Sequence, residues 1–116
     1  VIDDIQNINE FRYEKKGEQV ILFGGPPCQG YSNSNRKTRS NENPKNWLFQ
    51  EFMRTITLVN PDWVVIENVP GLKSIDKGFF IEKICNDLHE LGYTPNFKIL
   101  NAADFGVPQK RIKLKI

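Results

Sequence analysis

The sequence is poor in the side chains that build metal sites and cross-links. Its 116 residues include two cysteines, Cys28 and Cys85, and one histidine, His89. The cysteines lie far apart and form no C-x-x-C pair, so we expect neither a zinc site nor another bound metal. The first residues carry no basic region and no hydrophobic segment of a signal peptide. Few cysteines and no signal together predict a protein of a reducing cytoplasm.

Long apolar runs, internal repeats and low-complexity tracts are missing as well. No run approaches the roughly 18 apolar residues that a membrane-spanning helix needs, which argues against a membrane partner. A chain of this length builds one compact domain and not two. It does not begin with methionine, and it stops inside an alternating apolar run, 112–116. We therefore expect a fragment of a longer protein.

Charge is nearly balanced, yet the cations gather in two places. The formal net charge is only +2. Two local basic clusters are compatible with a bound polyanion, although ordinary solvated surface produces the same pattern. The first cluster holds Arg36, Lys37, Arg39 and Lys45, and the second holds Lys110, Arg111, Lys113 and Lys115.

The most distinctive stretch is residues 24–32, where an apolar run ends abruptly. Residues 20–23 are short and β-rich, which predicts a buried strand. Two glycines and two prolines then stop the strand. Cys28 follows at the carboxyl end of that strand, where open α/β sheets place their chemistry. Burial as an ordinary apolar cysteine is the alternative for Cys28.

A βαβ unit is predicted around this turn. Asn46 can cap a helix that begins at Trp47 and ends before Pro61. The continuous apolar run 64–66 then predicts a strand covered on both faces, parallel to the first one. Glu67 follows at the carboxyl end of this second strand.

The rest of the chain reads as a loop, a helix and two strands. Residues 73–77 read as a loop. The helix 79–91 has Cys85 on its buried face and His89 facing solvent, and Gly92 ends it. The strands are predicted over residues 93–100 and 111–116, the latter half-buried because its apolar residues alternate with cations.

Cys28 and Glu67 would emerge at the same edge of a parallel sheet. A thiolate and a carboxylic acid can together activate an unsaturated ring. The thiolate adds to an electron-poor carbon while the carboxyl group protonates a ring nitrogen. A thiol with a pKa near ~8.5 needs nearby cations for this role, and the basic residues would supply them.

Three motifs resemble those of the cytosine-C5 DNA methyltransferases of bacterial restriction-modification systems. They are PPCQGYS at 26–32, ENVPG at 67–71 and GVPQKR at 106–111, in family order and at compatible spacing. The resemblance implies part of a Rossmann-like methyltransferase fold, a three-layer α/β domain of parallel strands with an antiparallel C-terminal strand. Residues 1–116 would form part of the catalytic domain. The implied location is the bacterial cytoplasm.

The resemblance also implies a cofactor and a substrate. The cofactor would be S-adenosyl-L-methionine, with Asp4 on its adenine amine and Pro26 or Pro27 lining its pocket. The substrate would be double-stranded DNA, with the target cytosine flipped out of the stack.

Catalytic roles follow from the same resemblance. Cys28 would attack C6 of the cytosine, and Glu67 would bind the exocyclic amine and protonate N3, so that C5 takes the methyl group. Arg111 and Lys113 would complete the catalytic set, and Lys113 stands where the family usually has a second arginine. The residues expected to bind the substrate are Gln29, Ser32, Arg36, Lys37, Arg39, Lys45, Asn68 and Gln109.

Alternatives remain open at this point. The glycine-rich turn for the cofactor and the target-recognition domain are absent from the sequence, so we expect the isolated chain to be inactive. A related tRNA cytosine-C5 methyltransferase is one alternative. An inactive fragment or split-enzyme subunit that acts as a binding module is another. Exposed sheet edges would then favour self-association or a complementary subunit.

Overall fold

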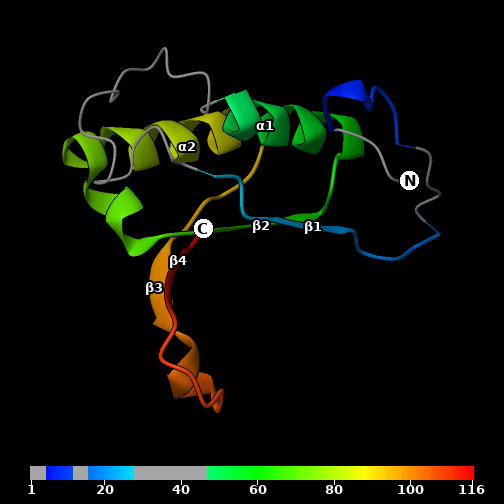
Figure 1. Cartoon of the computed structure of the whole chain (residues 1–116). Coiled ribbons are helices and arrows are strands. Elements are labelled where there is room, and N and C mark those ends of the chain that lie inside the picture. The colour runs from blue at the N-terminus through cyan, green and yellow to red at the C-terminus, as the bar shows by residue number, and fades with distance from the viewer. Residues whose placement is uncertain (1–4, 12–15, 28–46) are drawn as a thin grey trace.

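A computed structural model describes residues 5–11, 16–27 and 47–116. The described residues form one mixed sheet with the strand order β1-β2-β4-β3, together with two α-helices (Figure 1). The strands are β1 (Ile21–Gly24), β2 (Trp63–Asn68), β3 (Lys98–Asn101) and β4 (Ile112–Lys115), and the α-helices are α1 (Trp47–Val59) and α2 (Phe79–Glu90). Short 3-10 helices cover Ile5–Asn7, Pro70–Gly78 and Ala102–Phe105.

Strands β1 and β2 are parallel neighbours joined through α1. Gly24 at the end of β1 pairs with Ile66 near the end of β2. Both strands therefore end at one edge of the sheet, which confirms the predicted βαβ unit. Strand β4 runs antiparallel to β2 and to β3, so the predicted antiparallel C-terminal strand is confirmed too.

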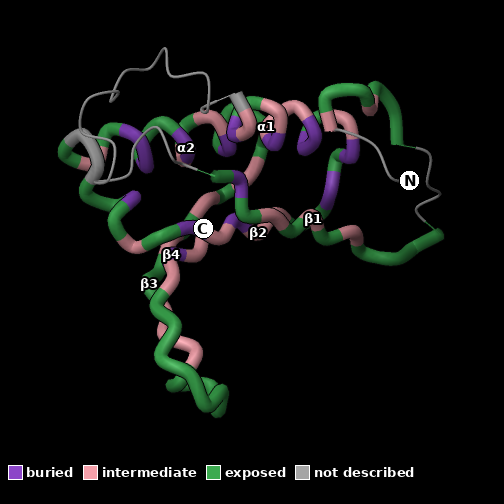
Figure 2. Tube along the Cα trace, in the orientation of Figure 1, coloured by how far each residue is buried: buried purple, intermediate pink, exposed green. Residues whose placement is uncertain are grey.

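Both α-helices cover the same face of the sheet, and the β3–β4 hairpin extends away from them (Figure 1). The core lies between this helical layer and the sheet (Figure 2). The described residues thus provide two layers, a sheet and one layer of helices. The fully buried side chains of this core are Ile56, Ile66, Leu72, Ile84 and Leu114.

The opposite face of β1 and β2 corrects the prediction of strands buried on both sides. Ile21 and Phe23 are 63% and 60% exposed, and Trp63 on β2 is 58% exposed. Successive side chains of a strand point to opposite faces, so every second residue of β1 faces away from the helices. The apolar runs therefore predicted the positions of the strands correctly, and the prediction that both strands are buried was wrong.

Two further boundaries differ from prediction. The segment expected as a loop over 73–77 belongs to the 3-10 helix Pro70–Gly78, which packs into the core through the fully buried Leu72. Of the strand expected over 93–100, only residues 98–100 belong to β3. The pairing between β3 and β4 begins at Lys98, which lies opposite Lys115.

The ends of the helices follow the predicted signals. Helix α1 ends at Val59, before Pro61. Gly92 follows α2 with a positive φ of 93°, and its N–H and that of Tyr93 donate to the carbonyls of His89 and Leu88, at 2.9 and 3.0 Å. This pattern satisfies the free carbonyls of the last turn, so the predicted helix stop at Gly92 is confirmed.

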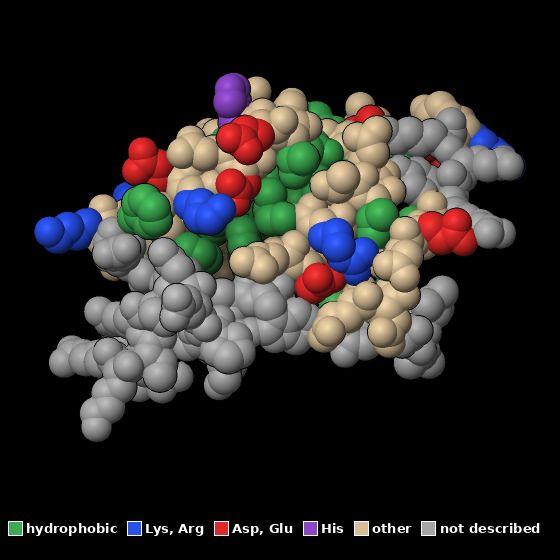
Figure 3. All heavy atoms as spheres, turned by 90° about the horizontal axis from the view of Figure 1, so that it is seen from above, with side chains coloured by type: hydrophobic (Ala, Val, Ile, Leu, Met, Phe, Trp, Pro, Cys, Tyr) green, Lys and Arg blue, Asp and Glu red, His purple; other side chains and the backbone are tan. Residues whose placement is uncertain are grey.

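Side chains of α2 match the prediction. Cys85 is half-buried and packs against the core, which confirms its predicted place on the buried face, and His89 is exposed as predicted. From the helix side, charged side chains of both signs lie among hydrophobic ones (Figure 3). None of the helices in the described parts of the chain is long and apolar enough to cross a membrane.

Arg54 ties the N-terminal 3-10 helix to α1. Its guanidinium donates to the carbonyl oxygens of Ile5 and Ile8, at 2.7 and 2.8 Å, and to the carboxylate of Glu51 at 2.7 Å. Ile5 and Ile8 are far from Arg54 in sequence. The planar guanidinium, with its several donors, therefore fixes the N-terminal 3-10 helix on α1.

Candidate active site

The turns that follow β1 and β2 are joined by Asn68. This side chain is buried, and its amide Nδ2 donates to the carbonyl oxygen of Pro26 at 3.0 Å. Its Oδ1 accepts from the backbone N–H of Val69 at 2.9 Å. One carboxamide thus uses both its donor and its acceptor to hold the two strand ends together. Asn68 lies beneath the turn, as part of the scaffold that carries Glu67.

The described part of the first turn ends at Pro27. Pro26 is buried and Pro27 is exposed. Cys28 comes next in the sequence and lies outside the described residues, so its predicted role stays a prediction. The other expected site residues outside the described parts are Asp4, Gln29, Ser32, Arg36, Lys37, Arg39 and Lys45, and the predicted helix cap Asn46 lies there too.

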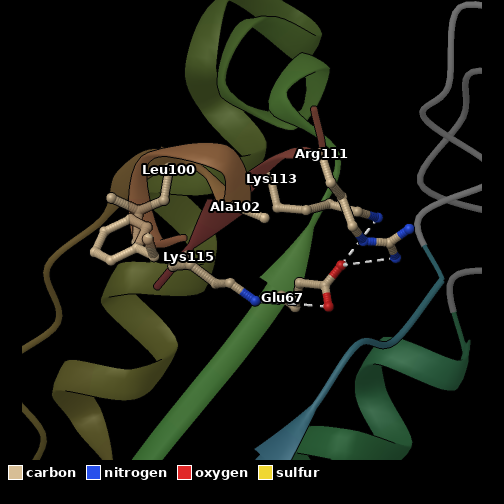
Figure 4. Close-up of a pocket in the computed structure, with 7 residues that line it drawn as sticks. Glu67, Leu100, Ala102, Arg111, Lys113 and Lys115 are labelled. Carbon is tan, nitrogen blue, oxygen red and sulfur yellow. Dashed lines mark ion pairs between the residues drawn. The ribbon is translucent and has the colours of Figure 1, made fainter. Parts of the chain in front are cut away.

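Glu67 faces three cations, Lys113 and Lys115 of β4 and Arg111, which directly precedes this strand. The Nζ of Lys113 lies 2.9 Å from Oε1, and a guanidinium nitrogen of Arg111 lies 3.9 Å from the same oxygen. The Nζ of Lys115 lies 3.6 Å from Oε2. Lys113 and Lys115 reach the carboxylate because alternate residues of β4 share a face, and Arg111, just before the strand, points the same way, as the close-up shows (Figure 4). The structure therefore brings together three of the predicted catalytic residues, Glu67, Arg111 and Lys113.

These contacts set the ionisation of the carboxyl group. The hydrogen bond from Lys113 lowers the pKa of Glu67 below its ordinary value of 4.5, and burial opposes this effect. The charges of Lys115, Lys113 and Arg111 lower the pKa further. Glu67 is consequently ionised at neutral pH when no ligand is bound.

A pocket opens beside Glu67 (Figure 4). Its volume is about 250 Å³, and its two sides differ in character. The polar side carries the carboxylate and the three cations, while the other side is an apolar wall from β3 and the 3-10 helix that follows it. This combination suits a small planar ring with hydrogen-bonding groups along one edge. The apolar wall consists of Leu100, Ala102 and Phe105.

The backbone of Arg111 is fixed by a residue that the sequence analysis missed. Asn101 Oδ1 accepts from the N–H of Arg111 at 3.2 Å and from that of Ala103 at 3.3 Å. The N–H of Ala102 donates to the carbonyl of Arg111 at 2.9 Å. Gln109 lies two residues earlier in an exposed turn and does not line the pocket.

Lys115 was missed as well, although its signal was available. The alternation of Arg111, Lys113 and Lys115 along one strand places all three side chains on one face. Only the pairing of β4 with β2 shows that this face points at Glu67. No sequence signal marks Asn101 for its role, because that role depends on the hairpin that brings it beside Arg111.

The second cysteine is partly buried against the core. Cys85 is a free thiol on α2, and burial raises the pKa of this thiol. A raised pKa lowers the fraction of thiolate, which is the reactive form. Cys85 is therefore poorly suited to nucleophilic chemistry at neutral pH.

Comparison with known proteins points to one family. The sequence model of the family described as C-5 cytosine-specific DNA methylase matches residues 1–116. The chain is 42% identical over 107 residues to the type II methyltransferase M1.HphI of Haemophilus parahaemolyticus, which covers 91% of this chain and 29% of that protein.

Two other relatives show a similar pattern. The type II methyltransferase M.BsuRI of Bacillus subtilis is 34% identical over 116 residues, covering 100% of this chain and 26% of the relative. The type II methyltransferase M.HhaI of Haemophilus parahaemolyticus is 36% identical over 111 residues, covering 96% of this chain and 33% of the relative. The chain thus spans between a quarter and a third of the length of these curated relatives.

Proposed function

The chain belongs to the C-5 cytosine-specific DNA methylase family, and from this premise we propose that the complete protein is a DNA (cytosine-5-)-methyltransferase of a restriction-modification system. One observation carries the proposal most directly. Glu67 lies near the end of β2 and faces Arg111, Lys113 and Lys115. The next residue, Asn68, bonds to Pro26 in the turn that leads toward Cys28. These contacts support a site in which Cys28 would follow the end of β1 and Glu67 lies near the end of the neighbouring strand β2.

The proposed reaction begins with the Cys28 thiolate. It forms a bond to C6 of the cytosine, and the electron pair of the C5–C6 double bond shifts toward N3, where Glu67 supplies a proton. C5 then carries enamine character and takes a methyl group. Loss of the C5 proton to a base expels the Cys28 thiolate, and N3 returns its proton to the Glu67 carboxylate, so the ring, the cysteine and the carboxylic acid are all restored. Cys28 is the nucleophile and Glu67 the general acid in this scheme.

Glu67 must gain a proton before it can act as an acid. The cations keep it ionised in the unliganded protein, in which its side chain is 22% exposed. A base that covers the pocket removes water from the carboxylate, and desolvation raises a carboxyl pKa. We propose that the arrival of the cytosine itself brings Glu67 into its protonated form, with the exocyclic amine on one oxygen and N3 on the other.

The pocket beside Glu67 would receive the flipped base. Attack at C6 approaches the face of the ring, which neighbouring bases cover in a duplex, so the cytosine must leave the stack. The apolar wall of Leu100, Ala102 and Phe105 would contact the ring, while Arg111 and Lys113 would face the polar edge of the base. Gln109 and the residues of 29–45 would bind the DNA around it, with the basic side chains on phosphates.

The family implies S-adenosyl-L-methionine as the cofactor, which supplies an electrophilic methyl group. The described residues give a partial fit: Pro27 is exposed beside the site, whereas Pro26 is buried and bonded to Asn68 through its carbonyl. We propose that Pro27 lines the cofactor pocket and that Asp4 binds the adenine amine. Arg54 would hold the segment that follows Asp4 on α1.

Further proposals concern the complete protein. We propose a three-layer Rossmann-like domain, in which residues 1–116 are one part of the catalytic domain and other parts cover the exposed face of β1 and β2. We also propose a location in the bacterial cytoplasm. Because the chain spans at most a third of the relatives compared above, we expect residues 1–116 alone to be inactive.

A transfer assay tests the proposed function. The complete protein is incubated with S-adenosylmethionine labelled on its methyl group and with either duplex DNA or tRNA. We expect label in DNA, as 5-methylcytosine, and none in tRNA. Label in tRNA alone would show an RNA methyltransferase with the same chemistry. Label in neither substrate would support the alternative of an inactive binding module.

A further inference from the structure

Lys115 lies directly opposite Glu67 across the β2–β4 pair. The flanking residues Ile66 and Ile116 exchange both backbone hydrogen bonds, each at 3.0 Å. Glu67 and Lys115 therefore form the non-hydrogen-bonded pair that follows, in which facing side chains lie closer together. Opposite charges at such a position attract across the strands. The register of the sheet thus places this lysine against the predicted general acid.

The cations divide unequally between the two carboxylate oxygens. Lys113 and Arg111 both approach Oε1, whereas Lys115 approaches Oε2 at 3.6 Å. A carboxylate held through one oxygen can still rotate about its terminal bond, because that torsion is broad. A second contact at the other oxygen restricts the plane of the group. Among the described residues, the ion pair at Oε2 comes from Lys115.

Lys115 has an anchor of its own. Its Nζ lies 5.5 Å from the centroid of the Phe23 ring, within the range of a cation–π interaction. Phe23 belongs to β1, the strand that leads into the turn before Cys28. Lys115 therefore contacts a side chain of each parallel strand, Phe23 of β1 and Glu67 of β2. It links the carboxylate to the strand that precedes the predicted nucleophile.

We propose that Lys115 is a positioning residue that holds Oε2 of Glu67 and sets the carboxylate plane in which the cytosine is received, an inference that rests on the proposed function. Lys113 and Arg111 bind the other oxygen, and Phe23 keeps the ammonium group in place. A cytosine presents N3 and its exocyclic amine side by side in the plane of the ring. Both oxygens of Glu67 must lie in that plane to serve the two groups together.

The test compares matched lysine variants of the complete protein. Lys98 is the control, because it is the register partner of Lys115 on β3 and is exposed. The variants K115M, K115R and K98M are measured for single-turnover methyl transfer to duplex DNA and for DNA affinity at one fixed salt concentration. Since small misplacements of catalytic groups slow reactions strongly, we expect K115M to reduce the transfer rate roughly tenfold. Its DNA affinity should change no more than that of K98M.

Two variants separate positioning from folding. Arginine keeps the charge and stacks on aromatic rings, so K115R should recover most of the transfer rate. The variant F23L removes the ring at a largely exposed position and should slow transfer in the same direction by a smaller factor. A thermal melt identifies any variant that fails to fold, and F23L then remains as the test.

The outcomes distinguish this inference from the proposed function. If the wild-type protein is active and K115M transfers methyl as fast as K98M, the role of Lys115 is wrong and the proposed function stands. Equal slowing in K115M and K115R would also overturn the positioning role. If the wild-type protein transfers no methyl group to DNA, both the proposed function and this inference fail.

Discussion

A single carboxylate among three cations dominates the electrostatics of the candidate site at the scale of residues. Glu67 accepts a hydrogen bond from Lys113 and lies near Arg111 and Lys115. The same contacts that place the group also oppose its protonation. Glu67 is therefore ionised in the unliganded protein. We expect it to become a proton donor only when a cytosine covers the site and excludes water from the carboxyl group.

The lowered pKa of Glu67 has a consequence for stability. The folded protein binds a proton at this carboxyl more weakly than the unfolded chain does. Its contribution to the free energy of unfolding is therefore complete above about pH 4.5, and it is lost as the pH falls through the lower folded-state pKa. We expect the stability difference between the wild-type protein and E67Q, measured by urea unfolding, to be larger near pH 7 than near pH 3. A difference that stays constant or grows toward low pH would contradict this.

Asn68 provides a second test at the scale of residues. Its amide donates to the carbonyl of Pro26 while its oxygen accepts from Val69. The variant N68D keeps the acceptor and replaces the donor by an oxygen that faces the Pro26 carbonyl. Because a buried polar group is left without its partner, we expect N68D and N68A each to lower the free energy of unfolding by about 1–3 kcal/mol. Thermal or urea unfolding measures this, and an N68D protein as stable as the wild type would show that the bond does not hold the turns together.

At the scale of elements, the contact between β1 and α1 sets the position of the first turn. Gly24 ends β1 directly under Phe52 of α1, whose ring is buried in the core. A methyl group on Gly24 would overlap this ring. The glycine that ends the strand is therefore needed for the close approach of helix and strand.

The matched glycine variants G24A and G71A test that contact. A Cβ on Gly24 would force the buried ring of Phe52 to shift within the core, so we expect G24A to lower the free energy of unfolding by about 1–3 kcal/mol. Gly71 has open space around its Cβ position and an ordinary φ, so G71A should change stability by no more than about 0.5 kcal/mol. Urea unfolding of both proteins gives the comparison. Equal effects of the two substitutions would mean that the helix and strand do not meet as closely as described.

The same elements show why sequence patterns located the strands but misjudged their burial. The runs 20–23 and 64–66 are apolar throughout, and such runs mark strands wherever they fall. Whether a given side chain is covered depends on what packs across from it. Ile21 and Phe23 of the first run point away from both helices and are exposed. No property of the runs themselves could have shown this.

At the scale of the whole molecule, the order of the elements and the ending of β1 and β2 at one edge of the sheet could be predicted from the sequence. Parallel strands joined by a helix must end at the same edge, so the residues that follow them converge. The contacts made by β4 could not be predicted. They depend on its register against β2, which places Lys115 opposite Glu67 and Leu114 opposite Asn68. A one-residue shift of that register would have turned the cations to the other face.

The attack of Cys28 on cytosine, in a site that Glu67 completes, is the step on which the proposed function depends. It is tested most directly with duplex DNA in which 5-fluorocytosine replaces cytosine. The final elimination removes a proton from C5, and fluorine at C5 leaves no proton to remove, so the covalent adduct is trapped. The complete protein is incubated with this DNA and S-adenosylmethionine, and the covalent complex is measured by denaturing electrophoresis. The matched variants are C28S and C85S, since Cys85 is the other thiol and burial raises its pKa. We predict an adduct with the wild type and with C85S and none with C28S, whereas an adduct that persists in C28S would contradict the account.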